Sequence, residues 1–171
     1  KLLVTGAGKD SPLFESEKGY RNWRKTKLQS CPKSVEEITV DIDALGSPGP
    51  AGINAIKQAC AISNMVIYRC REQSASRFYV RQFAEVFGLS NLDHHLCAND
   101  DGVSELSVAD KGDKAVYVPY SNRGLSWHTD GYYNEKSRQI NAVVLHCVQH
   151  ADTGGENALL DPEIAYILLR D

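Results

Sequence analysis

The sequence lacks the features that would place it in a membrane or on a nucleic acid. Its 171 residues contain no apolar run near the roughly 20 residues that a membrane-spanning helix needs. The opening residues, KLLVTG, do not have the charged and apolar regions of a signal peptide. Lys and Arg (19) do not outnumber Asp and Glu (22), so charge does not favour nucleic acid or an anionic membrane as a partner.

Cysteine pairs are also missing. The five cysteines, Cys31, Cys60, Cys70, Cys97 and Cys147, are odd in number and scattered along the chain. Without a C-x-x-C pair, neither a disulfide framework nor a zinc cluster is indicated. We expect reduced thiols that act mainly as small buried side chains, in a cytoplasmic protein.

A nucleotide-binding motif is begun near the start but not completed. Residues 2–9, LLVTGAGK, combine a strand-like run with Gly-x-Gly and Gly-Lys. The third glycine of a dinucleotide fingerprint is missing, and Asp10 follows the lysine where a phosphate loop has Ser or Thr. Pro12 interrupts the helix that should follow. We therefore reject a nucleotide site and expect a flexible terminus.

What is present is the composition and periodicity of one globular domain, with helices first and β-rich structure later. Helices are expected at 18–28, about 51–63, about 74–87 and 162–169, and strands at 38–42, 65–68, 115–120 and 140–148. The side chains expected to face inward are Tyr20, Trp23 and Leu28, then Ile53, Ile56, Ala59, Cys60 and Ile62, then Phe78, Phe83, Val86 and Phe87.

The strongest chemical signal is His128-Thr129-Asp130. In an extended segment, residues two apart point to the same side, so the imidazole and the carboxylate can converge on one ion. An imidazole nitrogen with a hard carboxylate oxygen suits Fe(II), Mn(II) or Zn(II). A His-x-Asp triplet by itself is weak evidence, because a surface hydrogen bond beside a turn has the same sequence.

A second signal follows in Thr153-Gly154-Gly155-Glu156-Asn157. Two adjacent glycines permit backbone angles that other residues avoid and let another group approach the main chain closely. Asn157 could offer its side-chain amide to a ligand carboxylate. Alone, a Gly-Gly turn indicates only a hairpin.

Together these segments resemble a known family. WHTDG (127–131), the run INAVVLHCVQH (140–150) and TGGENALLD (153–161) are similar to the taurine dioxygenase / γ-butyrobetaine hydroxylase family, the TauD/TfdA group. Upstream, the helix at 53–63, the strand MVIYRC (65–70) and the helix that ends in FAEVFG (83–88) resemble its amino-terminal part. The resemblance covers about residues 38–170.

The resemblance implies an α+β, mostly β fold, a double-stranded β-helix or jelly roll with amino-terminal helices. We expect a single domain over 1–171, with an extension at 1–34 and the family-like region at 35–171. The implied activity is oxidation of a small organic substrate with Fe(II), 2-oxoglutarate and O2, giving succinate and CO2 as co-products. A homo-oligomer is compatible with this assignment.

The resemblance also implies roles for individual residues. His128 and Asp130 correspond to the first two iron ligands, and Asn157 to a residue that hydrogen-bonds the cosubstrate carboxylate. Trp127 is expected to pack beside the iron-binding turn. The residues that could reach substrate are Tyr132 and Tyr133 after the ligands, and Tyr117, Tyr120, Asn122 and Arg123 before them.

The family's second histidine ligand, and an arginine that pairs with the far carboxylate of 2-oxoglutarate, lie well downstream of the Gly-Gly turn. His146 and His150 come too early to match that histidine, and His94-His95 is expected to be a solvated loop pair. We therefore expect the carboxy-terminal part of the catalytic centre to be missing from these 171 residues.

Two other functions remain open from the sequence. A hydrolase could use His128 and Asp130 around zinc or manganese with an activated water, although no further ligand motif accompanies them. Alternatively, a jelly roll that has lost its metal ligands could serve as a non-catalytic binding module.

Overall fold

The computed structural model describes residues 16–72, 76–93, 101–109 and 111–171. The chain divides into two compact units, the first made of Lys1–Phe87 with Asn141–Asp171 and the second of Gly88–Ile140. The segment 2–9, which resembles a nucleotide motif, lies outside the described residues. The expectation of a single domain stays a prediction.

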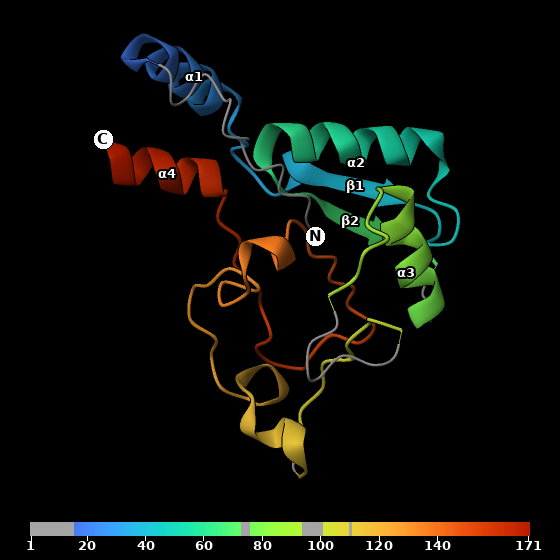
Figure 1. The fold of residues 1–171 in the computed structure, drawn as a ribbon. Helices are drawn as coiled ribbons and strands as arrows, with labels where there is room; N and C mark the ends of the chain where they lie inside the picture. The colour runs from blue at the N-terminus through green and yellow to red at the C-terminus, as the bar shows by residue number, and fades with distance from the viewer. Residues whose placement is uncertain (1–15, 73–75, 94–100, 110) are drawn as a thin grey trace. The chain divides into compact units, whose positions relative to one another are not determined.

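Unit 1 holds the longer helices and the only strands of the described residues (Figure 1). None of the helices in the described ranges has the length and apolar character needed to cross a bilayer. The elements in chain order are α1 (Glu17–Ser30), the 3₁₀ helix η1 (Glu36–Ile38), β1 (Thr39–Ile42), α2 (Gly49–Ser63), β2 (Ile67–Cys70), α3 (Arg77–Val86), the 3₁₀ helices η2 (Asp113–Val116), η3 (Val118–Tyr120) and η4 (Lys136–Arg138), and α4 (Pro162–Arg170).

The strands β1 and β2 are parallel and are joined through α2, which lies alongside them in Figure 1. The register pairs Thr39 with Ile67 and Ile42 with Cys70. Parallel strands need a long connection that returns the chain to the starting edge of the sheet, and α2 provides it. The residue that ends α2 is Asn64. Asn64 adopts the left-handed conformation with φ of 55°, and its N–H donates to the carbonyl of Cys60 at 2.8 Å.

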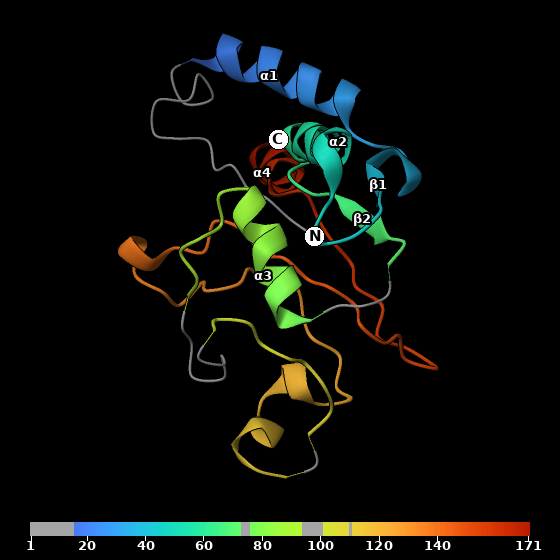
Figure 2. The same cartoon turned by 90° about the vertical axis from the view of Figure 1, so that its right-hand side faces the viewer.

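The core of unit 1 is the space between this β-α-β element and α3. Its buried members are Ile42, Leu45, Ile56, Cys60, Val66 and Phe83, with Val144 among the partly buried side chains around it. Helix α3 contributes Phe83, whose ring lies 4.8 Å from that of Tyr68 on β2 and 5.1 Å from that of Phe87. Figure 2 shows α3 next to the sheet from a second direction.

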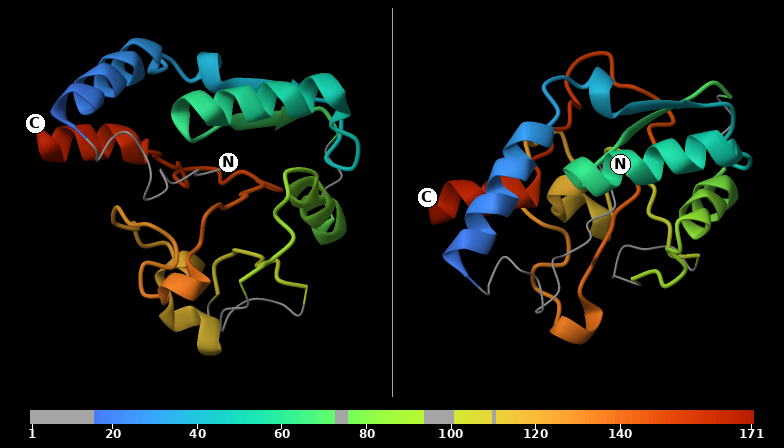
Figure 3. Two further views of the ribbon diagram at one scale, coloured as in Figure 1. Left: turned by 45° about the horizontal axis from the view of Figure 1, so that its top comes forward. Right: turned by 90° about the horizontal axis from the view of Figure 1, so that it is seen from above.

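Helices α1 and α4 cross one another, as both views of Figure 3 show. Aromatic and cationic side chains fill the crossing. The Arg170 guanidinium stacks 3.7 Å from the ring centroid of Tyr20, and Tyr166 meets Tyr20 edge to face at 6.2 Å. The Tyr20 hydroxyl donates to Asp171 at 2.6 Å, which ties the end of α4 to α1.

A buried polar cluster joins α1 to the start of α4 and the end of α2. Lys27 is only 5% exposed, and its ammonium nitrogen lies 2.6 Å from carboxylate oxygens of both Asp161 and Glu163. It also donates to the carbonyl of Ile62 at 2.6 Å. Asn64 donates to the same two carboxylates at 2.9 Å each. Every charge in this cluster therefore has a partner, as burial requires.

Unit 2 is built from loops and single helical turns, drawn in yellow and orange in Figure 2. Tyr120 is buried at its centre; its carbonyl accepts from the N–H of Ala109 at 2.9 Å, and Lys114 lies 5.0 Å from its ring centroid. The described residues between 91 and 114 are irregular apart from the start of η2.

The helix predictions are confirmed, but some of their inward faces are wrong. α1, α2, α3 and α4 lie where periodicity placed them, apart from the segment 73–75, which is outside the described residues. On α1, Leu28 is exposed and its neighbour Lys27 is buried instead. Ile62, Phe78 and Val86 are exposed as well, because no described segment covers those sides of α2 and α3.

Two strand predictions are wrong. Residues 115–120 form η2 and η3, and residues 140–148 are irregular apart from one bridge residue, Ala142. β-prone residues form a strand only where a neighbouring strand pairs with their backbone N–H and C=O groups. Among the described residues that neighbour is absent, and the only sheet is β1–β2. The mostly β content is therefore not found in the described ranges, and the jelly roll is not confirmed by them.

The described cysteines, Cys31, Cys60, Cys70 and Cys147, are thiols rather than disulfides. Only Cys60 is buried in the core, so the expectation of mainly buried thiols holds for one of these four. Cys97 lies outside the described residues.

Candidate functional site

The centre of the candidate site is the pair His128 and Asp130 in unit 2. The Nε2 atom of His128 lies 3.4 Å from Oδ1 of Asp130, so the two side chains face each other across the intervening Thr129. Their side chains are 38% and 49% exposed, which leaves the space beside them open to a ligand. The sequence predicts this approach, because residues two apart share one side of an extended segment.

The other imidazole nitrogen of His128 has a fixed role. Nδ1 lies 2.8 Å from the carbonyl oxygen of Ser126. A carbonyl oxygen can only accept, so Nδ1 must carry the proton. In the neutral ring the lone pair is then on Nε2, which is the atom that faces Asp130. This carbonyl contact is the kind of support that metal-binding histidines usually have.

The lone pair of Nε2 therefore faces a carboxylate oxygen. The two repel each other unless a proton or a metal cation lies between them. A proton on Nε2 would give an ion pair, and a divalent cation would give two coordination bonds. An imidazole nitrogen and a carboxylate oxygen fit Fe(II), Mn(II) or Zn(II). Within the described part of the chain, no three His, Cys, Asp or Glu side chains gather closely enough to complete such a site.

Gly131 sets the turn that follows Asp130. Its φ is +65°, a conformation that L-residues with side chains rarely adopt. A Cβ atom built there would lie 2.8 Å from two side-chain carbons of Ile140 and 2.9 Å from Nδ2 of Asn134. Asn134 closes the turn with an N–H donated to the Gly131 carbonyl at 2.8 Å. Both the positive φ and the lack of room for a Cβ atom therefore require glycine at position 131.

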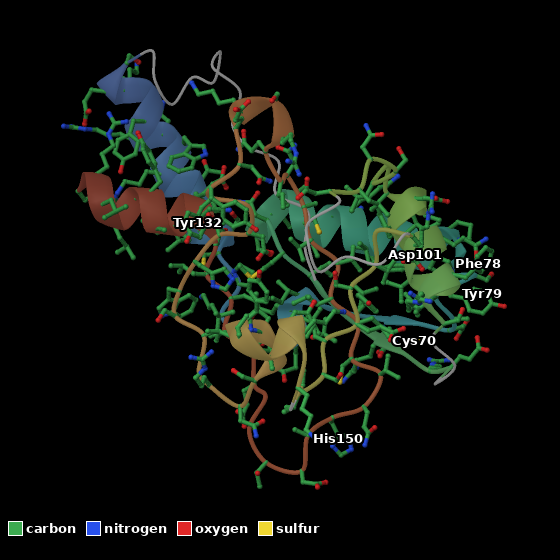
Figure 4. All side chains as sticks on the ribbon, turned by 60° about the horizontal axis from the view of Figure 1, so that its bottom comes forward. Cys70, Phe78, Tyr79, Asp101, Tyr132 and His150 are labelled. Atoms are coloured by element: carbon green, nitrogen blue, oxygen red, sulfur yellow. The ribbon has the colours of Figure 1, made fainter. Side chains whose placement is uncertain are left out.

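Three large aromatic side chains beside the pair are open to solvent. Tyr132 and Tyr133 are exposed and pack edge to face on each other, with ring centroids 5.2 Å apart (Tyr132 is labelled in Figure 4). Trp127 is 71% exposed, so the expectation that it packs beside the turn is wrong. The adjacent residues Ser126 and His128 are exposed as well and belong to no helix or strand.

Tyr120 and Arg123, two proposed substrate contacts, belong to the same unit as His128. Tyr120 is 3% exposed, which favours a packing role for its ring. The Arg123 guanidinium is close to the Ser121 hydroxyl and the Val116 carbonyl, at 3.4 Å each. Their roles toward a substrate stay predictions.

The Gly-Gly segment belongs to unit 1. Both glycines adopt the backbone angles that the sequence predicted, which other residues avoid. Gly154 and Gly155 have φ of +75° and +79°. The Asn157 side-chain amide donates to the Gly155 carbonyl at 3.4 Å, so the segment folds back on itself. An exposed Asn157 amide held by so long a hydrogen bond could turn to another acceptor. Its role in binding a cosubstrate stays a prediction.

The other histidines make contacts of their own. The His146 ring stacks on Tyr68 of β2, and its Nδ1 lies 3.1 Å from the Tyr68 hydroxyl, which also reaches the Leu145 carbonyl at 3.2 Å. Burial raises the pKa of Tyr68 and lowers that of His146. His150 is exposed (Figure 4), and its Nδ1 lies 3.2 Å from the Ala151 carbonyl. His94 and His95 lie outside the described residues.

Sequence reasoning missed Ser126, which bonds to His128, and Asn134, which closes the turn after Asp130. A backbone carbonyl as hydrogen-bond partner leaves no signal in the sequence, because every residue has one. Asn134 did leave a signal, since Asn is one of the residues that are common in turns.

Comparison with known proteins identifies the family of the chain. No curated protein and no solved structure matches the chain significantly. The family described as taurine catabolism dioxygenase TauD, TfdA family matches residues 27–171, a range that includes His128, Asp130 and the Gly-Gly segment. The chain therefore belongs to the TauD/TfdA family of dioxygenases.

Proposed function

We propose that this protein is an Fe(II)- and 2-oxoglutarate-dependent dioxygenase that oxidises a small organic substrate and releases succinate and CO2. His128 and Asp130 would be two of its iron ligands. Asn157 would bind the cosubstrate, and Tyr132, Tyr120 and Arg123 would contact the substrate. Membership of the TauD/TfdA family supports a dioxygenase-type oxidoreductase. The thiol state of the described cysteines is compatible with a cytoplasmic location.

The observation that supports this proposal most directly is the His128–Asp130 pair, with its atoms 3.4 Å apart and Nδ1 of His128 held by the Ser126 carbonyl. That hydrogen bond selects the tautomer whose lone pair faces the carboxylate. The ring is also held in orientation before any ion arrives, which reduces the entropy lost on binding.

Iron with bound 2-oxoglutarate would supply the activation of O2 and the oxidation of the substrate. The chain's own contribution would be to donate Nε2 of His128 and a carboxylate oxygen of Asp130 from one side of the metal. The Asn157 amide, turning from the Gly155 carbonyl, would donate a hydrogen bond to a carboxylate of 2-oxoglutarate.

An anaerobic titration tests the proposal. Fe(II) and then 2-oxoglutarate are added to the full-length protein, and the visible charge-transfer absorption of the iron–keto-acid chelate is followed. We expect a band for the wild-type protein and none for His128→Ala. His150→Ala is the matched control, because His150 is an exposed histidine with a similar backbone contact. Its band should equal that of the wild type.

The same samples separate the alternatives. Succinate formed in proportion to O2 consumed supports the dioxygenase. Tight Zn(II) or Mn(II) binding with no charge-transfer band under Fe(II) and 2-oxoglutarate would point instead to the hydrolase. A protein that binds none of these metals through His128 would be a non-catalytic module, and the dioxygenase proposal would be wrong.

A further inference from the structure

The loop after Asp130 is bonded to itself. The N–H of Asn134 donates to the Gly131 carbonyl at 2.8 Å, and the N–H of Arg138 donates to the Glu135 carbonyl at 2.8 Å. These two turns follow one another directly, so residues 131–138 form a compact excursion that begins at the residue next to Asp130.

The side chain of Asn134 links the two turns. Its Nδ2 donates to the carbonyl of Arg138 at 3.0 Å, across the mouth of the second turn. The same nitrogen is one of the atoms that a Cβ on Gly131 would meet, so it lies against the Gly131 backbone. Asn134 is partly buried, whereas Tyr132, Tyr133, Glu135 and Lys136 around it are exposed.

Two further contacts fix the ends of the excursion. Ile140 lies against Gly131 on the same side as Asn134. The Arg138 guanidinium binds Asp93 at 2.6 Å, which attaches the excursion to the segment after α3 within unit 2. Salt screens this ion pair, since the Arg138 side chain is exposed, whereas the hydrogen bond from the Asn134 amide is between uncharged groups.

We infer that Asn134 is a positioning residue for the metal ligands. The N–H of Asn134 closes the first turn, and its side chain joins that turn to the second. Together these contacts fix the direction in which the chain leaves Asp130, and hence the direction of the Asp130 carboxylate toward Nε2 of His128. The inference rests on the proposed function, because it assigns Asn134 a role at the same site. Groups that orient metal ligands typically change metal affinity about 10- to 100-fold when removed.

The test measures Co(II) binding, by affinity and by visible absorption, in the full-length protein. Asn134→Asp keeps the shape of the side chain and replaces the donor with an oxygen that repels the Arg138 carbonyl. Asn134→Ala removes the group altogether. We expect both variants to bind Co(II) about tenfold or more weakly, with a changed spectrum, and to keep the metal-free Tm of the wild type. Lys136→Gln, an exposed change in the same excursion, is the matched control and should behave as the wild type.

Unchanged Co(II) affinity and spectrum in Asn134→Asp, with a lower metal-free Tm, would overturn the inference and leave Asn134 a merely structural role. Failure of the proposed function looks different, because then the wild type and His128→Ala would bind Co(II) equally. If the Asn134 variants do not fold, hydrogen exchange on the wild type decides. Co(II) should slow exchange of the Asn134 and Arg138 amides, and no change would contradict the inference.

Discussion

At the scale of single residues, the position after Asp130 is under the tightest restriction. Gly131 combines a positive φ with three atoms closer than 3.0 Å to where a Cβ would stand. Ile140 and Asn134 supply those atoms, so relieving the contact would move the groups that shape the turn. A change at Gly131 should therefore affect metal binding as well as stability.

We expect Gly131→Ala to lower the free energy of unfolding by more than the roughly 1–2 kcal/mol of a left-handed L-residue, and to weaken Co(II) binding. Gly88→Ala is the matched control, with φ of +80° and nothing within 4 Å of the added atom. In this control, the free energy of unfolding should fall only by the cost of the backbone conformation, and the Co(II) affinity should equal that of the wild type. Urea unfolding and Co(II) titration measure both effects; equal losses in the two variants would argue against crowding at Gly131.

The hydroxyl and the ring of Tyr68 make different contacts, so their contributions to stability can be measured separately. Its hydroxyl has one hydrogen and the Leu145 carbonyl can only accept, so both contacts are satisfied when His146 Nδ1–H donates to the Tyr68 oxygen. We expect Tyr68→Phe to lower the free energy of unfolding by about 1 kcal/mol, since the ring packing on Phe83 remains. Tyr79→Phe, on an exposed side chain, should change it little. Similar losses would contradict a role for the Tyr68 hydroxyl.

The same contact predicts a dependence on pH. Burial lowers the pKa of His146, so the unfolded chain binds its proton more readily than the folded chain does. The unfolding free energy should therefore fall as pH drops below about 6.5 toward the folded-state pKa, and this part of the change should be missing in His146→Gln. Urea unfolding at pH 7.5 and pH 5 measures it. Equal losses in both proteins would exclude His146 as the source.

At the scale of elements, the helices were predictable because their signals are local. Ser16 caps α1 by accepting from the N–H of Gly19, and Asp161 caps α4 by accepting from the N–H of Glu163. Proline in the first turn of α4 and the apolar period of α2 belong to the same class of signal. Each of these helix signals depends on residues within one or two helical turns, so it can be recognised in the sequence alone.

Contacts between distant segments were not predictable in the same way. The pattern KGYRNWRKTKL placed Leu28 inward, yet the structure buries Lys27 because two carboxylates from the start of α4 surround its ammonium group. The predicted strand at 140–148 failed for a related reason, since a strand depends on a partner elsewhere in the chain. The His128–Asp130 approach was predictable, because it needs only the two-residue period of an extended backbone.

The buried cluster at Lys27 predicts how strongly the helices depend on it. Burial alone would lower the pKa of Lys27, but the hydrogen bonds that its ammonium group donates to Asp161 and Glu163 outweigh burial, and the pKa is raised. We expect Lys27→Met to lower the free energy of unfolding by about 3–5 kcal/mol, because two carboxylates would lose the cation that neutralises them. The exposed change Lys25→Met should stay within about 0.5 kcal/mol of the wild type by denaturant unfolding.

A compensated variant provides the control for that experiment. Adding Asp161→Asn and Glu163→Gln to Lys27→Met removes the unpaired charges and should restore part of the lost stability. If the triple variant is no more stable than Lys27→Met, the loss comes from packing of the lysine stem rather than from charge.

At the scale of the whole molecule, ligand binding and folding are linked. A ligand that binds only the folded protein stabilises it by about 2.7 kcal/mol when its concentration is 100 times its Kd. We expect Mn(II) with 2-oxoglutarate to raise the Tm of the wild-type protein in a concentration-dependent way, and not that of His128→Ala. Calorimetric scans measure the shift. An equal rise in the two proteins would place the metal elsewhere.

The position of Lys27 also bears on where the catalytic domain begins. The family match opens at residue 27, in the last turn of α1, whereas the turns that hold this lysine in place lie upstream of it. A shortened protein that starts at the matched boundary would keep the cation but lose the scaffold that directs it inward. For expression or domain exchange, α1 should therefore be kept whole, including its cap Ser16, instead of being cut at the first residue shared with the family.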